Sequence, residues 1–262
     1  MTSILQRLLM TLYAIAKSSG FLDSRPGKWI FRRAYFAYKL WLEPTPLALQ
    51  SYVEPGSWVV DVGSNLGFYT LLFSHWVSGA GKIVSIEPAA ENFAALENMI
   101  AAEGLTGKVI SLQAVASEVD GHLHLKLNPG SHADHRIADG GVAIKSVRLD
   151  SLLEQHGRPR VSLIKIDVQG AEPRVLAGSL STLRDFAPVV YMEVDDSALR
   201  ESGSSAIELM DMMRGLGYLA YEVKGKDLSG ALSNADISSM LRKLGYADFL
   251  FLPESSPSAI SR

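Results

Sequence analysis

The sequence contains no cysteine among its 262 residues. A chain without cysteine forms no disulfide, builds no cysteine zinc site or iron–sulfur cluster, and has no thiol nucleophile. Any covalent or metal chemistry must therefore use histidine, carboxylate, hydroxyl or lysine side chains. The absence assigns no redox compartment, because proteins without disulfides occur in all of them.

A strong excess of either charge is also missing. Lys and Arg number 25 against 28 Asp and Glu, which gives a formal net charge of −3. Non-specific nucleic-acid binding needs a basic excess, so we expect no nucleic-acid partner. The hydrophobic share of 47% excludes a wholly disordered chain. The length suits one α/β domain or two small ones with a full core.

Long apolar runs are missing as well, since no window reaches the ~18 consecutive apolar residues of a membrane-spanning helix. The nearest stretch, residues 4–16, is interrupted by Gln6 and Arg7. Its flanks do not fit a secretory signal peptide. Its apolar residues recur at helical spacing, so we expect a helix packed on the domain. Contact of this helix with a membrane surface is the alternative. We expect the protein to be cytoplasmic.

From Gly56 onward the pattern alternates between strands and helices. Short apolar runs predict buried parallel strands, and the segments between them have helical spacing. This order predicts an α/β fold with a doubly wound, mostly parallel, Rossmann-like sheet whose last strand is antiparallel. The predicted strands are 57–62, 82–87, 109–112, 162–167, 188–193, 218–223 and 248–252. The predicted helices are 68–77, one opened by Pro88, 170–177 and 206–216.

The regularity lapses after the third predicted strand. Residues 122–127 alternate strictly between polar and apolar side chains, which predicts a half-exposed strand, and 142–149 fits its antiparallel partner. We therefore expect an inserted β-hairpin with a polar loop at 128–141. The organisation that we expect is an N-terminal helical extension or cap over 1–55, one domain over 56–252 and a flexible tail over 253–262.

Four predicted strands end in a carboxylate: Asp61, Glu87, Asp167 and Glu193. In a doubly wound sheet, ligands bind outside the carboxyl ends of the strands. The turn after the first strand, residues 63–67, begins and ends with glycine, which lets the backbone approach a ligand closely. It is not a dinucleotide fingerprint, because Asn65 and Phe68 stand where that motif has its second and third glycines.

The pattern Asp61-x-Gly63-x-Asn65-x-Gly67 resembles the first motif of class I S-adenosylmethionine-dependent methyltransferases. Residues 163–172, LIKIDVQGAE, followed by VLAG at 175–178, resemble the signature of FkbM-type methyltransferases. That signature usually carries Glu where this chain has Gln169. The resemblance covers residues 53–252, and the two stretches together make it specific. The N-terminal extension lies outside it.

The resemblance implies a domain over 56–252 that binds S-adenosylmethionine and leaves S-adenosylhomocysteine as product. Glu87 would accept hydrogen bonds from the ribose hydroxyls, and Asp61 would face the ammonium group of the cofactor, directly or through water. The implied cofactor-binding residues are Asp61, Gly63, Ser64, Asn65, Gly67, Phe68, Tyr69, Thr70, Glu87, Pro88, Asn92, Gln113, Ala114 and Asp167.

The family resemblance also implies methyl transfer to a hydroxyl oxygen of a sugar, glycan or polyketide-like secondary metabolite. This reaction needs an aligned acceptor oxygen and a group that takes its proton. The candidate bases are Asp167 and Glu193 at strand ends, and His132 and His135 in the 128–141 loop. Asp167 has the alternative role of positioning the cofactor only. Glu172 is better interpreted as a helix cap.

Three alternatives stay open beside this prediction. We expect no metal, and the alternative is a divalent ion held by Asp167, Glu193, Asp195 and Asp196. A second alternative is N-methylation of a small amine, and a third is a non-catalytic binding module with a cofactor fold. The stretch 167–170 lacks the proline pair that base methylation commonly needs. We expect a small-molecule or glycan acceptor, selected by residues 1–55 and 128–141.

Overall fold

The computed structural model describes 45–126, 136–137, 141–224 and 227–254, together with Gly27, Ile30, Arg33, Ala34, Phe36 and Ala37. The chain divides into two compact units, Met1–Pro46 and Leu47–Arg262. The helix expected at 4–16 lies outside the described residues, as does the tail expected over 253–262 apart from its first two residues. Of these two, Pro253 is the last residue of a strand. Within the described part of the chain, no helix combines the length and apolar character needed to cross a bilayer.

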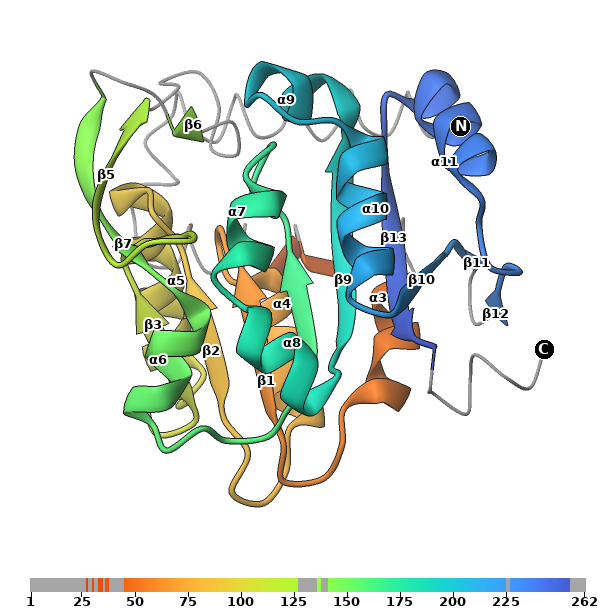
Figure 1. Ribbon diagram of the computed structural model, residues 1–262. Coiled ribbons are helices and arrows are strands. Elements are labelled where there is room, and N and C mark those ends of the chain that lie inside the picture. The colour runs from red at the N-terminus through yellow and green to blue at the C-terminus, as the bar shows by residue number, and fades with distance from the viewer. Residues whose placement is uncertain are drawn as a thin grey trace. The chain divides into compact units, whose positions relative to one another are not determined.

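The second unit is built around a seven-stranded sheet (Figure 1). Its strand order is β10-β13-β9-β8-β1-β2-β3. Only β13 runs antiparallel to its neighbours β9 and β10, so the predicted α/β fold with a doubly wound sheet and an antiparallel last strand is confirmed. The strands are β1 (Trp58–Val62), β2 (Ile83–Ile86), β3 (Val109–Leu112), β8 (Val161–Ile166), β9 (Val189–Asp195), β10 (Tyr218–Tyr221) and β13 (Tyr246–Pro253).

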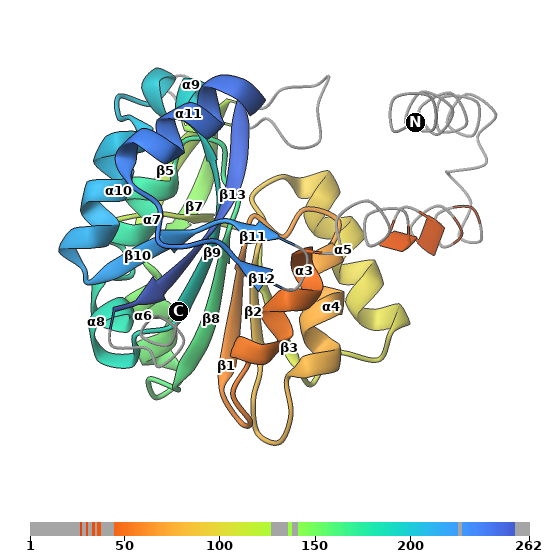
Figure 2. The same cartoon turned by 90° about the vertical axis from the view of Figure 1, so that its right-hand side faces the viewer.

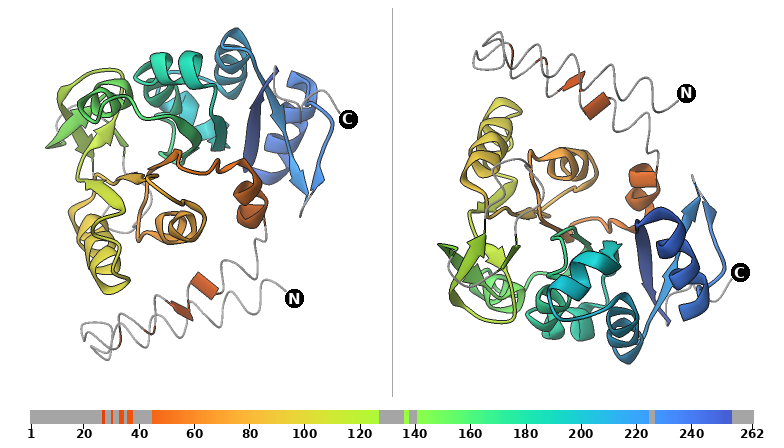
Figure 3. Two further views of the ribbon diagram at one scale, coloured as in Figure 1. Left: turned by 90° about the horizontal axis from the view of Figure 1, so that it is seen from below. Right: turned by 90° about the horizontal axis from the view of Figure 1, so that it is seen from above.

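Helices cover both faces of this sheet (Figure 2). α4 (Phe68–Trp76) and α5 (Ala90–Ala102) lie on one face, and α7 (Glu172–Ala177), α8 (Leu180–Phe186) and α10 (Ala206–Gly215) on the other. The views along the strands in Figure 3 show the two helical layers from both ends of the sheet. Further described elements, besides the segment inserted after β3, are α3 (Thr45–Ala48), η2 (Leu49–Tyr52), α6 (Leu149–Gln155), α9 (Asp196–Glu201), β11 (Val223–Lys224), β12 (Asp227–Leu228) and α11 (Asn234–Leu244).

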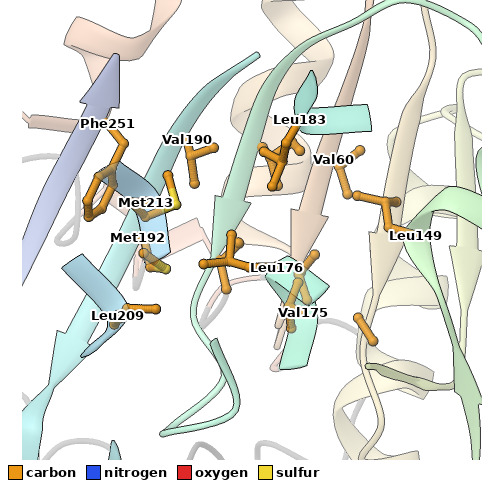
Figure 4. Packing of buried hydrophobic residues seen from close by; sticks show 14 of the residues in the cluster. Val60, Leu149, Val175, Leu176, Leu183, Val190, Met192, Leu209, Met213 and Phe251 are labelled. Carbon is orange, nitrogen blue, oxygen red and sulfur yellow. The ribbon is translucent and has the colours of Figure 1, made fainter. Parts of the chain in front are cut away.

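The two faces of the sheet differ in polarity. Successive side chains of a strand point to opposite faces, and those that face α7, α8 and α10 are apolar. They pack with the helices into one buried cluster, in which Val60, Val190 and Met192 lie among Leu176, Leu183, Leu209 and Met213 (Figure 4). On the face that α4 covers, buried polar residues interrupt the apolar pattern, among them Asp61 and Lys165.

The segment inserted after β3 forms a second sheet in the order β4-β7-β5-β6. β5 (Gly121–Lys126) and β7 (Val142–Val147) pair antiparallel, as the predicted hairpin requires. The expectation of an uninterrupted loop over 128–141 is wrong at β6 (Arg136–Ile137), because this short strand pairs with β5. β4 (Val115–Ala116), which pairs in parallel with β7, was not predicted.

Candidate functional site

The strand order of the main sheet reverses between β1 and β8, which lie side by side. The chain leaves β1 towards β2 and β3 on one side, and leaves β8 towards β9 on the other. In doubly wound sheets, ligands bind at the carboxyl ends of the strands beside such a switch point. The turn after β1, residues 63–67, and the segment after β8, residues 167–171, meet there.

Gly63 lies directly against the backbone of Asp167. A Cβ atom on Gly63 would come within 1.9 Å of the Asp167 carbonyl oxygen, which no side chain tolerates. Its φ of 75° is also in the left-handed region that favours glycine. The amides of Gly63 and Ser64 both donate to the carbonyl oxygen of Ile86, at 3.0 and 3.1 Å. The turn is therefore fixed to the ends of three strands.

Gly67 closes the turn and caps the first turn of α4. Its φ is 88°, and a Cβ atom there would lie 2.5 Å from Cε of Met99 and 2.9 Å from Cδ1 of Leu96, both on α5. Asn65, between the two glycines, also has a positive φ, of 50°. Glycine is thus required at position 63 by the backbone of Asp167 and at position 67 by the left-handed conformation that starts α4.

Glu87 follows β2 and is buried beside this turn. Its Oε2 accepts a hydrogen bond from the Asn65 amide at 2.9 Å. Its Oε1 accepts from the Ala89 amide at 2.9 Å and from Nδ2 of Asn92 at 3.3 Å. Burial raises the pKa of Glu87, although these hydrogen bonds oppose the shift. The carboxylate is held in a fixed position at the edge of the sheet.

Asp61 lies deeper than expected. The register pairs Val62 with both Ile86 and Ile166, so the residues that follow these three strands are level with one another. Asp61 is two residues before Gly63, or about 6.6 Å down the strand. The prediction of four equivalent strand-end carboxylates is therefore wrong for Asp61. Its side chain is fully buried, and its Oδ2 accepts a hydrogen bond from Oγ1 of Thr70 at 2.7 Å.

Lys165 places a buried cation beneath the same edge, with only 4% of its surface exposed. Its Nζ donates to the Gly63 carbonyl oxygen at 3.0 Å and to Oδ2 of Asp167 at 3.2 Å. It lies 3.7 Å from Oδ1 of Asp61 and 5.0 Å from the centre of the Tyr69 ring. Burial lowers the pKa of Lys165, but the Asp167 and Asp61 carboxylates outweigh it, so the pKa is raised and the ammonium group stays charged.

Two of the candidate bases lie at this edge. Asp167 follows β8, and 33% of its side chain is exposed. Glu193 is level with it, since Ile166 pairs with Met192, although β9 continues to Asp195 rather than ending at Glu193 as predicted. Glu193 is half-buried. The other two candidates, His132 and His135, lie outside the described residues.

The remaining residues of the predicted cofactor set surround the turn and the start of α5. Among the predicted cofactor-binding residues, Gln113 has an exposed side chain. Phe68, Tyr69 and Thr70 are buried in the first turn of α4, Ser64 is buried within the turn, Pro88 is half-buried, Asn92 is buried beside Glu87, and Ala114 is buried between β3 and β4.

The carboxylates considered as alternative metal ligands have structural partners. Asp195 caps α9 by accepting hydrogen bonds from the amides of Ser197 and Ala198. Asp196 accepts from the Ala206 amide at 2.8 Å and from Arg200. Over the described ranges, no group of three or more His, Asp or Glu side chains is arranged to hold a metal ion.

Glu172 is a buried acid at the start of α7, with 2% of its surface exposed. Its Oε1 accepts a hydrogen bond from the Gly170 amide at 3.0 Å, in the turn that precedes the helix. The interpretation as a helix cap is therefore wrong, because α7 begins after Ala171 without a side-chain cap. Its Oε2 is buried without a hydrogen-bond partner. Burial raises the pKa of Glu172 to about 7.

Comparison with known proteins gives one family. The family model described as the methyltransferase FkbM domain matches residues 61–220. The chain is similar to the hexuronic acid methyltransferase AglP of Haloferax volcanii, with 29% identity over 133 residues, covering 50% of this chain and 53% of that protein.

Two further curated relatives have similar identity. The 31-O-demethyl-FK506 methyltransferase FkbM of Streptomyces tacrolimicus is 28% identical over 158 residues, covering 48% of this chain and 60% of that protein. The 2-O-methyltransferase NoeI of Sinorhizobium fredii is 29% identical over 99 residues, covering 38% of this chain and 40% of that protein. The chain thus spans about half the length of the curated relatives that it matches.

Proposed function

This chain belongs to the FkbM methyltransferase domain family, and we propose that it is an S-adenosylmethionine-dependent O-methyltransferase. The family match over residues 61–220 covers more than half of the chain and includes the whole candidate site. The names of two of the three relatives specify an oxygen position, 31-O and 2-O, and the third names a hexuronic acid. These names support a hydroxyl acceptor.

The observation that carries the proposal is the turn at the switch point, where Gly63 lies against Asp167 and beside Glu87. S-adenosylmethionine has no phosphate, and its amino-acid part is zwitterionic, so a turn without the dinucleotide glycines and with carboxylates nearby suits it. Oδ1 of Asn65 is buried in this turn without a hydrogen-bond partner. A polar atom of this kind is usually paired in the functional state. The residues present therefore fit the cofactor.

Each part of the edge has a role in this proposal. S-adenosylmethionine supplies the electrophilic methyl group. Glu87 would accept hydrogen bonds from the ribose hydroxyls. The turn 63–65, which lies above the buried pair of Asp61 and Lys165, would hold the amino-acid part. Asp167 or Glu193 would take the proton of the acceptor hydroxyl. The methyl group would pass from the sulfonium sulfur to the acceptor oxygen, which leaves S-adenosylhomocysteine. Both carboxylates are partly accessible at the edge where the acceptor would enter.

We assign the acceptor to the class of sugar, glycan or secondary-metabolite hydroxyls. The relatives' names support this class, and none of them names a nucleic acid. A near-neutral charge balance, 25 basic against 28 acidic residues, agrees with a small acceptor rather than a polyanion.

Isothermal titration calorimetry with S-adenosylhomocysteine tests the cofactor assignment. We expect one saturable site on the unaltered protein, and a flat titration with both this compound and S-adenosylmethionine would remove the proposal. Mass spectrometry of glycans and metabolites, incubated with S-adenosylmethionine and with or without the protein, then identifies the acceptor by the mass of one added methyl group. Cofactor binding without methylation of any acceptor class would favour a non-catalytic binding module.

A further inference from the structure

A row of polar side chains crosses the main sheet one level beneath the candidate site. The register pairs Ser85 with Asp61, Asp61 with Lys165, and Lys165 with Tyr191. All four residues are buried, and they lie on the face that α4 covers. Burying polar groups costs free energy unless they are paired, so this row needs an explanation beyond the formation of a core.

Lys165 is the member of the row that reaches the candidate site. Residues two apart along an extended strand lie on the same face. Lys165 therefore lies one level below Asp167, the residue that follows β8, and Asp61 lies one level below Gly63, the residue that follows β1. The ammonium group pairs with Asp61 at its own level. It also donates upward to the Gly63 carbonyl oxygen and to the Asp167 carboxylate, at 3.0 and 3.2 Å. One buried cation therefore joins both sides of the switch point.

The contact between Gly63 and Asp167 has one backbone hydrogen bond beside it, from the Asp167 amide to the Val62 carbonyl oxygen at 3.1 Å. The absence of a Cβ atom lets the two backbones touch, and Lys165 adds the side-chain hydrogen bonds that hold the Gly63 turn itself. Charge-assisted hydrogen bonds are both directional and strong, and burial protects them from screening by salt. The raised pKa of Lys165 keeps these donors charged at neutral pH.

We propose that Lys165 is a positioning residue, whose ammonium group fixes the Gly63 turn against Asp167 from below and so sets the affinity of the site for S-adenosylmethionine and its product. The affinity part rests on the proposed function, whereas the fixation of the turn does not. Lys165 has no contact with the cofactor in this proposal. It acts on the shape of the turn and on the direction of the Asp167 carboxylate.

Replacement of the ammonium group tests the proposal. We expect Lys165→Met to bind S-adenosylhomocysteine about tenfold more weakly in calorimetry, equivalent to about 1.4 kcal/mol. Lys165→Arg, which keeps the charge and donors, should recover part of this loss. Lys165→Gln, which keeps a neutral donor, replaces the Met variant in the comparison if that variant does not fold.

Tyr191→Phe is the matched control. Tyr191 is buried in the same row on the neighbouring strand, and its hydroxyl group interacts with Tyr69 and Asp248 rather than with the turn. Its loss should lower the melting temperature and leave the affinity for S-adenosylhomocysteine unchanged. A purely structural role of the whole row would instead weaken binding equally in both variants, which would overturn the proposal.

Hydrogen exchange on the protein without ligand tests the fixation directly. The amides of Gly63 and Ser64, which donate to Ile86, should exchange faster in Lys165→Met and at the unaltered rate in Tyr191→Phe. Unchanged exchange together with unchanged affinity in Lys165→Met overturns this inference alone. Failure of the unaltered protein to bind either compound removes the proposed function, while the exchange rates still decide whether Lys165 fixes the turn.

Discussion

The side-chain amide of Gln169 donates a hydrogen bond to Oε1 of Glu193 at 3.0 Å. Gln169 lies in the segment after β8 and has a φ of 54°, so its backbone is in the left-handed region. FkbM-type signatures usually carry Glu at this place. In this chain the neutral amide of Gln169 donates to the Glu193 carboxylate. A Glu side chain at position 169 would instead repel that carboxylate when both are ionised.

Gln169→Glu should therefore destabilise the protein only where both carboxylates are ionised. We expect a loss of about 1 kcal/mol in the free energy of unfolding near pH 8, and a much smaller loss near pH 4, where a protonated acid can donate in place of the amide. Denaturant unfolding at the two pH values measures this. Gln113→Glu, which adds the same charge on an exposed side chain, should show neither loss. Equal stability of Gln169→Glu and the parent near pH 8 would contradict the argument.

Gly63→Ala should be severely destabilising. The added methyl group would lie 1.9 Å from the Asp167 carbonyl oxygen and would force β1 and β8 apart at the switch point. We expect a loss of about 3 kcal/mol or more in the free energy of unfolding, since overpacking and backbone strain add. Gly104→Ala separates the two causes, because Gly104 has a similar φ of 69° and nothing within 4 Å of its Cβ position. Equal losses in both variants would show that strain alone is responsible.

Glu87→Ala should weaken the binding of S-adenosylhomocysteine. The variant loses the proposed hydrogen bonds to the ribose, each with a net value of about 0.5–1.5 kcal/mol, and leaves the Asn65 amide without its acceptor. Calorimetry measures the change. Glu91→Ala, on an exposed position in the first turn of α5, serves as the control and should bind as the parent does. Unchanged affinity in Glu87→Ala would remove the ribose assignment.

Glu172 should make the stability of the protein depend on pH. Its pKa is raised by burial from 4.5 to about 7. Between these values the folded state holds a proton that the unfolded state releases, so stability falls as pH rises through this window and is level above it. Glu172→Gln should remove this fall and be more stable than the parent near pH 8, by up to about 3 kcal/mol. Near pH 4 the two proteins should unfold alike.

Thermal unfolding across this window measures the effect of Glu172. Glu154→Gln removes an exposed carboxylate on α6 and should leave the pH dependence of the parent in place. A parent protein whose melting temperature does not fall between the two pKa values would refute the assignment to Glu172.

Asp167→Asn and Glu193→Gln should separate the two described base candidates once the acceptor is known. Loss of the true base should lower kcat by about 10²–10⁴-fold. Glu193→Gln should retain the binding of S-adenosylhomocysteine, whereas Asp167→Asn should also weaken it, because the Asp167 carboxylate pairs with Lys165. Loss of a carboxylate that only positions the acceptor should act mainly on KM. Full turnover in either variant removes that residue from the candidates.

The apolar runs of the sequence predicted the main sheet well, because parallel strands buried on both faces read as continuous apolar segments. The short strands β4 and β6, two residues each, carry no periodicity that could reveal them. α11 was missed although its start has a readable signal. Ser233 and Asp236 form a capping box in the structure, and their spacing is visible in the sequence.

The candidate site was predicted less completely. The turn and the strand-end residues were found because glycine and carboxylate stand out at the end of an apolar run. Asp61 was placed too near the edge, since one more strand residue, Val62, follows it. Lys165 received no role, although a lone lysine inside the run Leu163–Ile166 is the signal of a buried cation with partners on another strand. Which residues are those partners depends on the order of the strands in the sheet, and the sequence alone does not determine that order.

The hydrogen bond from Lys165 to Gly63 joins residues 102 positions apart in the chain. Contacts of such long range form only after a large loop has closed, so they tend to slow folding and to require most of the sheet. The proposed binding site would therefore be absent from a partly folded chain. A ligand that occupies it stabilises the whole fold by mass action rather than one loop. A rise of the melting temperature with S-adenosylhomocysteine concentration would thus report ligand binding to the fully folded domain.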